Sequence, residues 1–242
     1  MKIVGVIPAR YASIRFPGKP LALLAGKPMV LHVLDAARAA LRLDRVVVAT
    51  DDDRIAAAVR GAGGEAVLTS VQAASGTDRL AEAAQTVAAD IYVNIQGDEP
   101  MMSPENVDRA VATLLAAPGR DIATLSVAMP AVEASDPNTV KVAVARDGRA
   151  LYFSRAAIPH FRSGEPAYRK HLGIYVYRAA ALAQLAALAP SPLERAESLE
   201  QLRWLEAGFP IWVGEAATDS LGVDTPADLA RAESLMKKEA VS

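Results

Sequence analysis

The feature that most constrains this chain is a series of short, mainly apolar runs that alternate with helical segments. Four such runs lie in the first half of the sequence, at residues 2–8, 45–50, 65–68 and 90–95. Strands that are buried on both faces have continuous apolar runs, and strands that alternate with helices form parallel sheets. We therefore predict an α/β fold whose mostly parallel central sheet is covered by helices on both faces.

The second half of the chain predicts an antiparallel hairpin that leaves this sheet. Residues 122–129 and 140–145 have the composition of strands, and Asp147-Gly148 separates the second of these runs from a further strand at 149–153. Glycine suits this turn because it adopts the positive φ angles that tight hairpins need. A polar loop at 159–168 and a strand at 172–177 follow.

Two capping signals start the last helices. Ser191-Pro192-Leu193-Glu194 combines a capping box with proline at the first helical position, and it predicts one helix that runs to Gly208. Thr225-Pro226-Ala227-Asp228 repeats the pattern and starts the terminal helix.

Composition and charge exclude several classes of protein. Lys and Arg together number 26 and Asp and Glu 28, so the formal net charge is −2, and without a basic tract we expect no nucleic acid as partner. The absence of cysteine excludes disulfides, zinc knuckles and thiol catalysis. No run approaches the roughly 20 apolar residues of a membrane span, and the apolar start is too short for a signal-peptide core. We expect a cytoplasmic protein without a membrane span.

The loop after the first strand is rich in cations. It carries Arg10, Arg15 and Lys19, with a hydroxyl at Ser13, and it lies at the strand end where open α/β sheets bind ligands. Three cations on one loop repel each other unless an anion lies between them, and guanidinium and ammonium groups suit phosphate oxygens. A solvated basic loop is the alternative, but the position favours phosphate binding. No Walker A loop or G-x-G-x-x-G is present, which argues against P-loop kinases and classical dehydrogenases.

Two carboxylates follow predicted strands or precede predicted helices. Asp98 lies in Gln96-Gly97-Asp98 directly after a strand, and Asp224 precedes Thr225, which can cap the terminal helix itself. Mg²⁺ is typically held by one or two carboxylates plus substrate phosphates. Each aspartate alone could equally be a turn or cap residue. Together with the basic loop they favour a metal pair.

Other polar residues allow two interpretations each. Ser75-Gly76 opens a helix and Arg79 follows in its first turn, so this segment either contacts a nucleotide or simply caps the helix. Gln96 has the hydrogen-bonding groups to contact a sugar or a base edge. His171 either contacts a sugar or is a buried, satisfied histidine, whereas His32 has the apolar spacing of a structural residue.

Several segments together resemble one enzyme family. PARYASIRFPGKP, ASGTDRLAE, NIQGDEPM, ALYFSRAAIP, KHLGIYVYR and GVDTPADL occur in this order across essentially the whole chain. The sequence resembles the 3-deoxy-manno-octulosonate cytidylyltransferases. The opening loop alone indicates only a sugar-nucleotide cytidylyltransferase, and the later segments are the more specific ones.

The resemblance implies a reaction and a set of site residues. The reaction is transfer of CMP from CTP to the anomeric hydroxyl of 3-deoxy-D-manno-octulosonate (Kdo), which releases pyrophosphate and feeds lipopolysaccharide synthesis. The implied nucleotide residues are Arg10, Ser13, Arg15, Lys19, Ser75, Gly76 and Arg79, with Arg10, Lys19 and Asp98 catalytic. Asp98 and Asp224 would hold Mg²⁺. The implied sugar residues are Gln96, Arg155, His171, Tyr175, Glu200 and Gln201, with Arg155 as partner of the Kdo carboxylate.

The resemblance also implies an architecture. It is a Rossmann-like nucleotidyltransferase with a protruding antiparallel dimerisation hairpin, so we expect a homodimer of single-domain chains, 1–242. Within the chain we expect a nucleotide-binding half at 1–130, a sugar-binding and dimerisation region at 131–215, and a metal-ligand loop with the terminal helix at 216–242. The short loop at 159–168 leaves a related acid sugar, 8-amino-3,8-dideoxy-octulosonate, as an alternative substrate. A regulatory module without turnover is disfavoured because both metal carboxylates are present.

Overall fold

The computed structural model describes residues 1–12, 16–73 and 75–239 of the chain. The chain forms two compact units: Met1–Asp108 with Ser220–Ser242, and Arg109–Asp219. Among the described residues, no helix combines the length and the apolar character that a membrane crossing requires.

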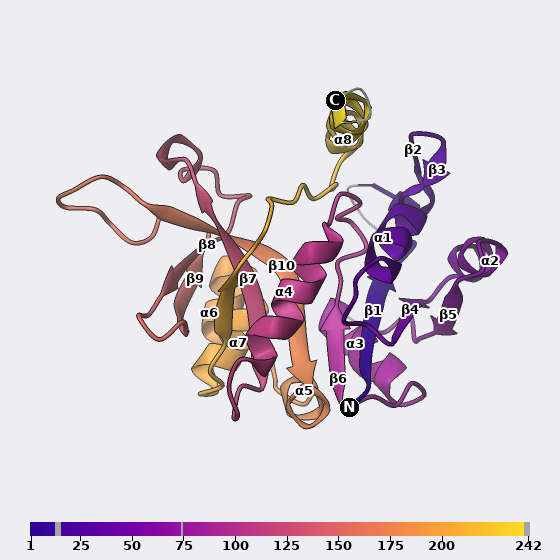
Figure 1. Cartoon of the computed structure of the whole chain (residues 1–242), viewed down its shortest axis with the longest axis horizontal. Coiled ribbons are helices and arrows are strands. Elements are labelled where there is room, and N and C mark those ends of the chain that lie inside the picture. The colour runs from indigo at the N-terminus through magenta and orange to yellow at the C-terminus, as the bar shows by residue number, and fades with distance from the viewer. Residues whose placement is uncertain (13–15, 74, 240–242) are drawn as a thin grey trace. The chain divides into compact units, whose positions relative to one another are not determined.

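Four parallel strands form the sheet of the first unit. In spatial order they are β6 (Ile91–Asn94), β1 (Ile3–Ala9), β4 (Arg45–Thr50) and β5 (Glu65–Leu68), which lie side by side in Figure 1. Their side chains are almost entirely buried in β1, β4 and β6, as fully apolar runs require. The predicted parallel sheet and its strands are confirmed, except that the edge strand β5 is not buried on both faces.

Helices cover this sheet and fix the loops at its end. The first unit contains α1 (Met29–Arg38), α2 (Asp53–Gly61), α3 (Gly76–Ala84), α8 (Pro226–Glu239), the short helix η1 (Lys19–Leu21) and the small strands β2 (Leu23–Leu24) and β3 (Lys27–Pro28). Helix α4 (Pro104–Leu115) leads from the first unit into the second. The ring of His32 bonds the Leu24 carbonyl at 2.8 Å through Nε2, so its predicted structural role is confirmed.

A small apolar cluster attaches α8 to the rest of the first unit. Ala232 of α8 and Val223 before it are fully buried against Leu24 and Met29. Burying these side chains holds the segment between Val223 and α8 against the loops of the first half. This packing matters for the site because Asp224 lies in that segment.

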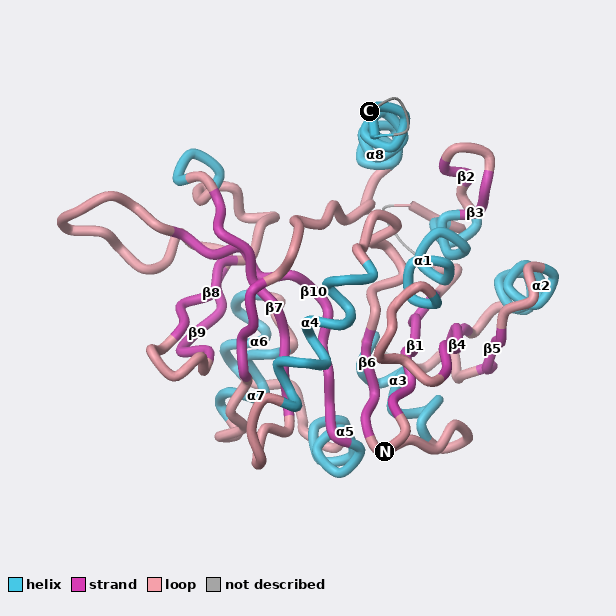
Figure 2. Tube along the Cα trace, in the orientation of Figure 1, coloured by secondary structure: helices cyan, strands magenta, loops and turns pink. Residues whose placement is uncertain are grey.

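The second unit is built on antiparallel strands. Strand β10 (Tyr168–Arg178) pairs antiparallel with β7 (Ile122–Met129) and with β8 (Lys141–Val144), and β8 pairs with β9 (Ala150–Ser154). Strand β11 (Trp212–Glu215) lies parallel to β7 on its other side. The β8–β9 pair is the predicted hairpin and is drawn in magenta in Figure 2. The short helix η2 (Ala131–Glu133) and helix α5 (Ala179–Ala186) complete these connections.

The prediction of one helix from Ser191 to Gly208 is wrong. The chain forms α6 (Pro192–Glu197) and α7 (Gln201–Glu206), and Ser198 between them is left-handed with φ of 52°. A left-handed residue ends an α-helix because it turns the backbone out of the helical path. Arg155 accompanies this break, since its guanidinium donates to the carbonyls of Glu197 at 2.7 Å and Ser198 at 3.4 Å. A long-range contact therefore satisfies carbonyls that a continuous helix would bond internally.

Candidate active site

A cavity of about 450 Å³ lies where the parallel strands of the first unit end. Its wall comes from the segments after β1 and β6, the N-terminus of α3 and the loop before α8. Open α/β sheets bind ligands at this edge. The lining residues are Pro8, Ala9, Arg10, Lys19, Pro20, Ala73, Ser75, Gly76, Arg79, Gln96, Gly97, Asp98 and Asp224. The cavity thus brings together every described residue that the sequence predicts to bind the nucleotide or a metal, and Gln96 as well.

The ammonium group of Lys19 bridges the two predicted metal ligands. Its Nζ donates to Asp98 Oδ2 at 2.8 Å and to Asp224 Oδ1 at 3.2 Å. The side chain of Lys19 is 13% exposed, that of Asp98 35% and that of Asp224 47%, so the carboxylates keep access to the cavity while the lysine lies deeper. Two acidic side chains from distant parts of the chain therefore meet at one cationic position.

Backbone and capping contacts hold this pair of loops together. The N–H of Val223 donates to the carbonyl of Asp98 at 2.8 Å. Thr225 and Asp228 form the capping contacts of α8: Thr225 N donates to Asp228 Oδ2 at 2.9 Å, and Asp228 N to Thr225 Oγ1 at 3.2 Å. This confirms that Thr225, and not the Asp224 side chain, caps the helix. The Asp224 carboxylate points to Lys19 instead.

The two ends of the basic loop are joined by a backbone hydrogen bond. Gly18 N donates to the carbonyl of Tyr11 at 3.0 Å, and Gly18 has φ of 71°, a conformation that favours glycine. The Tyr11 ring is covered by the guanidinium of Arg54, 3.5 Å from the ring centroid. Ser13 and Arg15 lie outside the described residues, so their predicted phosphate contacts remain predictions.

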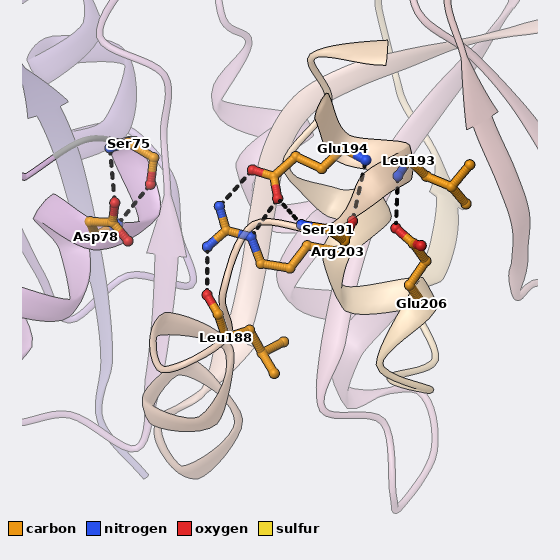
Figure 3. A network of polar contacts seen from close by, with 8 residues as sticks. All are labelled: Ser75, Asp78, Leu188, Ser191, Leu193, Glu194, Arg203 and Glu206. Atoms are coloured by element: carbon orange, nitrogen blue, oxygen red, sulfur yellow. Dashed lines mark hydrogen bonds and ion pairs between the residues drawn. The ribbon is translucent and has the colours of Figure 1, made fainter. Parts of the chain in front are cut away.

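The N-terminus of α3 is capped by its own residues. Ser75 Oγ accepts from Asp78 N, and Asp78 Oδ2 accepts from Ser75 N, both at 3.0 Å (Figure 3). These residues therefore cap α3, and the predicted nucleotide contact of the segment stays a prediction. Ser75 and Gly76 also line the cavity, and the N-terminus of a helix attracts anions.

Arg79 lines the cavity and is held there by a buried ion pair. Its Nη2 donates to Asp51 Oδ2 at 3.0 Å and its Nη1 to Thr69 Oγ1 at 2.5 Å. The side chains of Arg79 and Asp51 are only 3% and 11% exposed. These contacts fix the guanidinium, so Arg79 presents a rigid positive edge to whatever fills the cavity.

We expect different effects on stability and on ligand binding when each of two cavity glycines is changed to alanine. A Cβ on Gly97 would lie 2.5 Å from the Pro8 carbonyl oxygen, whereas a Cβ on Gly76 would meet Pro8 Cγ at 3.6 Å and Asn94 Nδ2 at 3.8 Å, which are ordinary contacts. We expect Gly97→Ala to lower the free energy of unfolding by about 1–3 kcal/mol, since backbone must shift. We expect Gly76→Ala to keep wild-type stability but to weaken CTP binding about tenfold, because its methyl group takes space at the cavity wall. Thermal unfolding and calorimetric titration of both variants with CTP check this, and a stable Gly97→Ala variant would contradict it.

In the second unit, two of the predicted sugar residues lie in one aromatic cluster. The rings of His171 and Tyr175 on β10 are 5.3 Å apart, and Tyr175 meets Trp204 of α7 edge-on at 5.1 Å. Phe153 of β9 packs edge-on against His171 at 4.9 Å. Aromatic rings together with a few polar groups are typical of the walls of small-molecule sites.

Two polar atoms of this cluster are buried without a hydrogen-bond partner in the part of the chain that the structure describes. Among the described residues, Tyr175 OH and Trp204 Nε1 are buried and have no hydrogen-bond partner. Burial raises the pKa of Tyr175 well above its ordinary value, and the nearby Tyr177 and Glu200 add to the shift. Burial lowers the pKa of His171 to about 3, so its ring is neutral. Unsatisfied donors at a buried position are costly unless a ligand accepts from them.

Comparison with known proteins gives the family. The family model for cytidylyltransferases matches residues 4–215. A protein of Syntrophobacter fumaroxidans named 3-deoxy-manno-octulosonate cytidylyltransferase is 51% identical, over 100% of this chain and 99% of that protein. One of the same name from an Anaeromyxobacter species is 52% identical over 96% of each. The chain belongs to the 3-deoxy-manno-octulosonate cytidylyltransferase family. A solved CMP:2-keto-3-deoxy-manno-octonic acid synthetase complexed with CTP superimposes on this cytidylyltransferase with a TM-score of 0.95 at 47% identity, covering 99% of this chain and 100% of that one.

In this cytidylyltransferase the guanidinium of Arg155 is anchored by backbone carbonyls. Besides Glu197 and Ser198, Nη1 donates to the Pro137 carbonyl at 2.9 Å. The backbone N–H of Arg155 donates to Glu197 Oε2 at 2.9 Å. Arg155 therefore joins the end of β9 to the break before α7, which carries Gln201 at its start and Glu200 just before it. Its predicted contact with a sugar carboxylate stays a prediction.

Sequence reasoning missed several residues that shape the site. Asp51 and Thr69 hold Arg79, and Lys141 donates from a fully buried position to the carbonyls of Asp136, Thr139 and Arg155. A lysine inside an alternating apolar strand was a visible signal, because charged side chains are almost never fully buried unless they are paired. Asp51 follows a strand end, as Asp98 does, and the same positional argument could have marked it.

Proposed function

We propose that this protein transfers CMP from CTP to the anomeric hydroxyl of Kdo and releases pyrophosphate. The observation that carries the proposal is the cavity of the first unit, where Lys19 and the N-terminus of α3 meet Asp98 and Asp224. Family membership supports it, as does the CTP complex of the similar synthetase. We propose that the product is used in lipopolysaccharide assembly and that the reaction takes place in the cytoplasm.

The reaction depends on positioning and on charge neutralisation. The anomeric oxygen attacks the α-phosphorus, a P–O bond to it forms, and the bond to the β-phosphate oxygen breaks, so pyrophosphate leaves and the hydroxyl proton passes to solvent. Phosphoryl-type transfer needs little covalent help from a protein. Arg10, Lys19 and the helix N-terminus at Gly76 are the groups of this chain that would bind the triphosphate and stabilise the charge on the leaving group.

The residues of the cavity fit a bound Mg²⁺. Among the described residues no three His, Asp or Glu side chains gather into a metal site, but Asp98 and Asp224 both contact the Lys19 ammonium nitrogen, and this supports their sharing a single cation. One or two carboxylates plus substrate phosphates are what Mg²⁺ usually takes. We propose that these two aspartates hold it. When bound, the metal would supply charge neutralisation at the phosphates and a lower pKa of the attacking hydroxyl.

Lys19 gives a prediction of moderate size for this mechanism. Lys19→Ala removes one charge-assisted hydrogen bond to the triphosphate, which is worth about 1.5–3 kcal/mol. We expect kcat/KM for CTP to fall on the order of 10-fold or more, since every 1.36 kcal/mol is about tenfold in rate. Steady-state assays over a range of Mg²⁺ concentration check this. An unchanged kcat/KM would remove Lys19 from the mechanism.

The sugar acid is tested by substrate comparison. We propose Kdo rather than 8-amino-3,8-dideoxy-octulosonate, because the relatives that span the whole chain are named for Kdo. Pyrophosphate release from CTP and Mg²⁺ is measured with each acid in turn. A higher kcat/KM with Kdo supports the proposal. A preference for the amino sugar, or no release with either acid, would contradict it.

We also propose a homodimer formed through the β8–β9 hairpin. Leu151 on β9 is 65% exposed, and β9 offers an edge for pairing with another chain. Size-exclusion chromatography with light scattering distinguishes a dimer from a monomer.

A further inference from the structure

A β-bulge in the second unit brings a threonine hydroxyl against the ring of His171. In the pairing of β10 with β7, Leu172 lies opposite Leu125 but Tyr175 lies opposite Thr124, so Gly173 and Ile174 are extra residues. Bulges of this kind re-aim side chains and are over-represented beside active sites. Here the bulge lies between His171 and Tyr175, two of the predicted sugar residues.

The hydroxyl of Thr124 is fixed by the carbonyls of the bulge. Its Oγ1 lies 2.7 Å from the Ile174 carbonyl oxygen and 3.2 Å from that of Leu172, and Thr124 is fully buried. A hydroxyl has a single proton to donate. The carbonyl oxygens of Leu172 and Ile174 can only accept, so the Thr124 hydroxyl directs its proton to the bulge. The lone pairs of Oγ1 remain for another donor.

His171 Nε2 occupies that donor position, 3.0 Å from Thr124 Oγ1. If Nε2 were the unprotonated nitrogen, Thr124 would have to donate to it, and the carbonyl of Ile174 would face an oxygen at 2.7 Å with no proton between them. The neutral ring therefore carries its proton on Nε2, and Nδ1 keeps its lone pair. The tautomer of a histidine is set by the hydrogen bond that its other nitrogen makes.

We propose that Thr124 is a positioning residue for His171: it fixes the Nε2-protonated tautomer, so that Nδ1 accepts a hydrogen bond from a hydroxyl of the sugar acid. This inference rests on the proposed function, because it takes the sugar acid as the ligand of His171. The chemistry also fits the substrate class, because a sugar hydroxyl can donate a hydrogen bond to Nδ1. In the same cluster, Tyr175 OH and Trp204 Nε1 have no hydrogen-bond partner among the described residues.

Three variants separate positioning from plain structural loss. Thr124→Val keeps the shape and removes the hydroxyl, and Thr124→Ser keeps the hydroxyl. Thr113→Val is the matched control, because the Thr113 hydroxyl donates to the Arg109 carbonyl at 2.8 Å in the same unit. The first readout is the tautomer of His171 in histidine-¹⁵N-labelled protein by long-range ¹H–¹⁵N correlation, with the signals assigned by His32→Gln and His160→Gln. The second is KM for Kdo and KM for CTP, measured separately.

We expect wild type and Thr124→Ser to show the Nε2-protonated ring, and Thr124→Val to show a mixture of tautomers. KM for Kdo should rise about 5- to 10-fold in Thr124→Val, as for one lost hydrogen bond, while KM for CTP stays at the wild-type value. Thr113→Val should change neither KM. An Nδ1-protonated ring in the wild type, or equal rises in both KM values, would overturn the proposal. The NMR experiment needs no substrate, so wild-type protein with the expected tautomer but no pyrophosphate release would refute the proposed function and not the hydrogen-bond geometry.

Discussion

Asp98→Asn is expected to lower kcat at least about 100-fold while leaving the folded protein intact. The change removes one of the two carboxylates that meet at Lys19, and it leaves an amide that binds Mg²⁺ weakly. Mutation of groups that only support a metal ligand already costs roughly 10- to 100-fold, so loss of a ligand itself should cost more. Raising the Mg²⁺ concentration should restore part of the rate, and a Mg²⁺ titration of pyrophosphate release measures both effects.

The free energy of unfolding of Asp98→Asn distinguishes a loss of metal binding from a loss of the folded structure. Asp98 is 35% exposed and Lys19 keeps Asp224 as a partner, so the free energy of unfolding should change by no more than about 1 kcal/mol. Asp35→Asn is the matched control, because Asp35 pairs with Lys27 on the surface of the same unit and lies outside the cavity. The metal assignment fails if Asp98→Asn keeps the wild-type rate and the wild-type Mg²⁺ dependence.

The parallel half of the fold could be predicted because its signals are local. Continuous apolar runs such as residues 45–50 and 91–94 mark strands that are buried on both faces, whatever lies beside them. The second unit was harder, since its outcome depends on contacts between distant segments. The break at Ser198 accompanies contacts with Arg155, and the bulge in β10 is bonded by Thr124 of another strand. Neither contact can be predicted from the local composition of the sequence.

The same distinction applies to the site. Residues at strand ends, such as Arg10 and Asp98, could be identified because the end of a parallel strand is where ligands bind. The bridge from Lys19 to Asp224 joins distant parts of the sequence, and the packing of Val223 and its backbone hydrogen bond to Asp98 hold these parts together. Sequence reasoning therefore found the members of the cavity but not the contacts between them.

Arg203→Met is expected to cause the largest loss of stability. Arg203 forks onto Glu194, with Nε to Oε2 at 2.7 Å and Nη2 to Oε1 at 2.5 Å, and Nη1 donates to the Leu188 carbonyl at 3.0 Å (Figure 3). The two charged side chains are only 10% and 15% exposed. Removing one partner of a buried pair costs about 3–5 kcal/mol, because the other charge stays buried without compensation. At about 2–4 °C per kcal/mol, Tm should fall by roughly 6–20 °C in a thermal scan at neutral pH.

A surface Arg–Glu pair that uses the same two donor nitrogens provides the control. Arg45 forks onto Glu65 through Nε and Nη2, but these side chains are 33% and 53% exposed, so Arg45→Met should cost no more than about 1 kcal/mol. Adding Glu194→Gln to Arg203→Met should recover much of the lost Tm, since no unpaired charge remains. Equal losses from the buried and the surface variant would contradict the argument.

The pH dependence follows from the same ion pair. The hydrogen bonds from Arg203 hold the pKa of Glu194 below its ordinary value of 4.5. A group whose pKa is lowered by folding contributes stability that is present above its unfolded pKa and is lost as the pH falls through the folded value. The Tm difference between wild type and Arg203→Met should therefore be largest near neutral pH and shrink as the pH falls below 4.5. Because α7 begins at Gln201, loosening this pair should also raise KM for the sugar acid while leaving CTP binding at the wild-type level. A Tm difference that is independent of pH down to pH 3 would show that the lost stability comes from packing and not from the charge of Glu194.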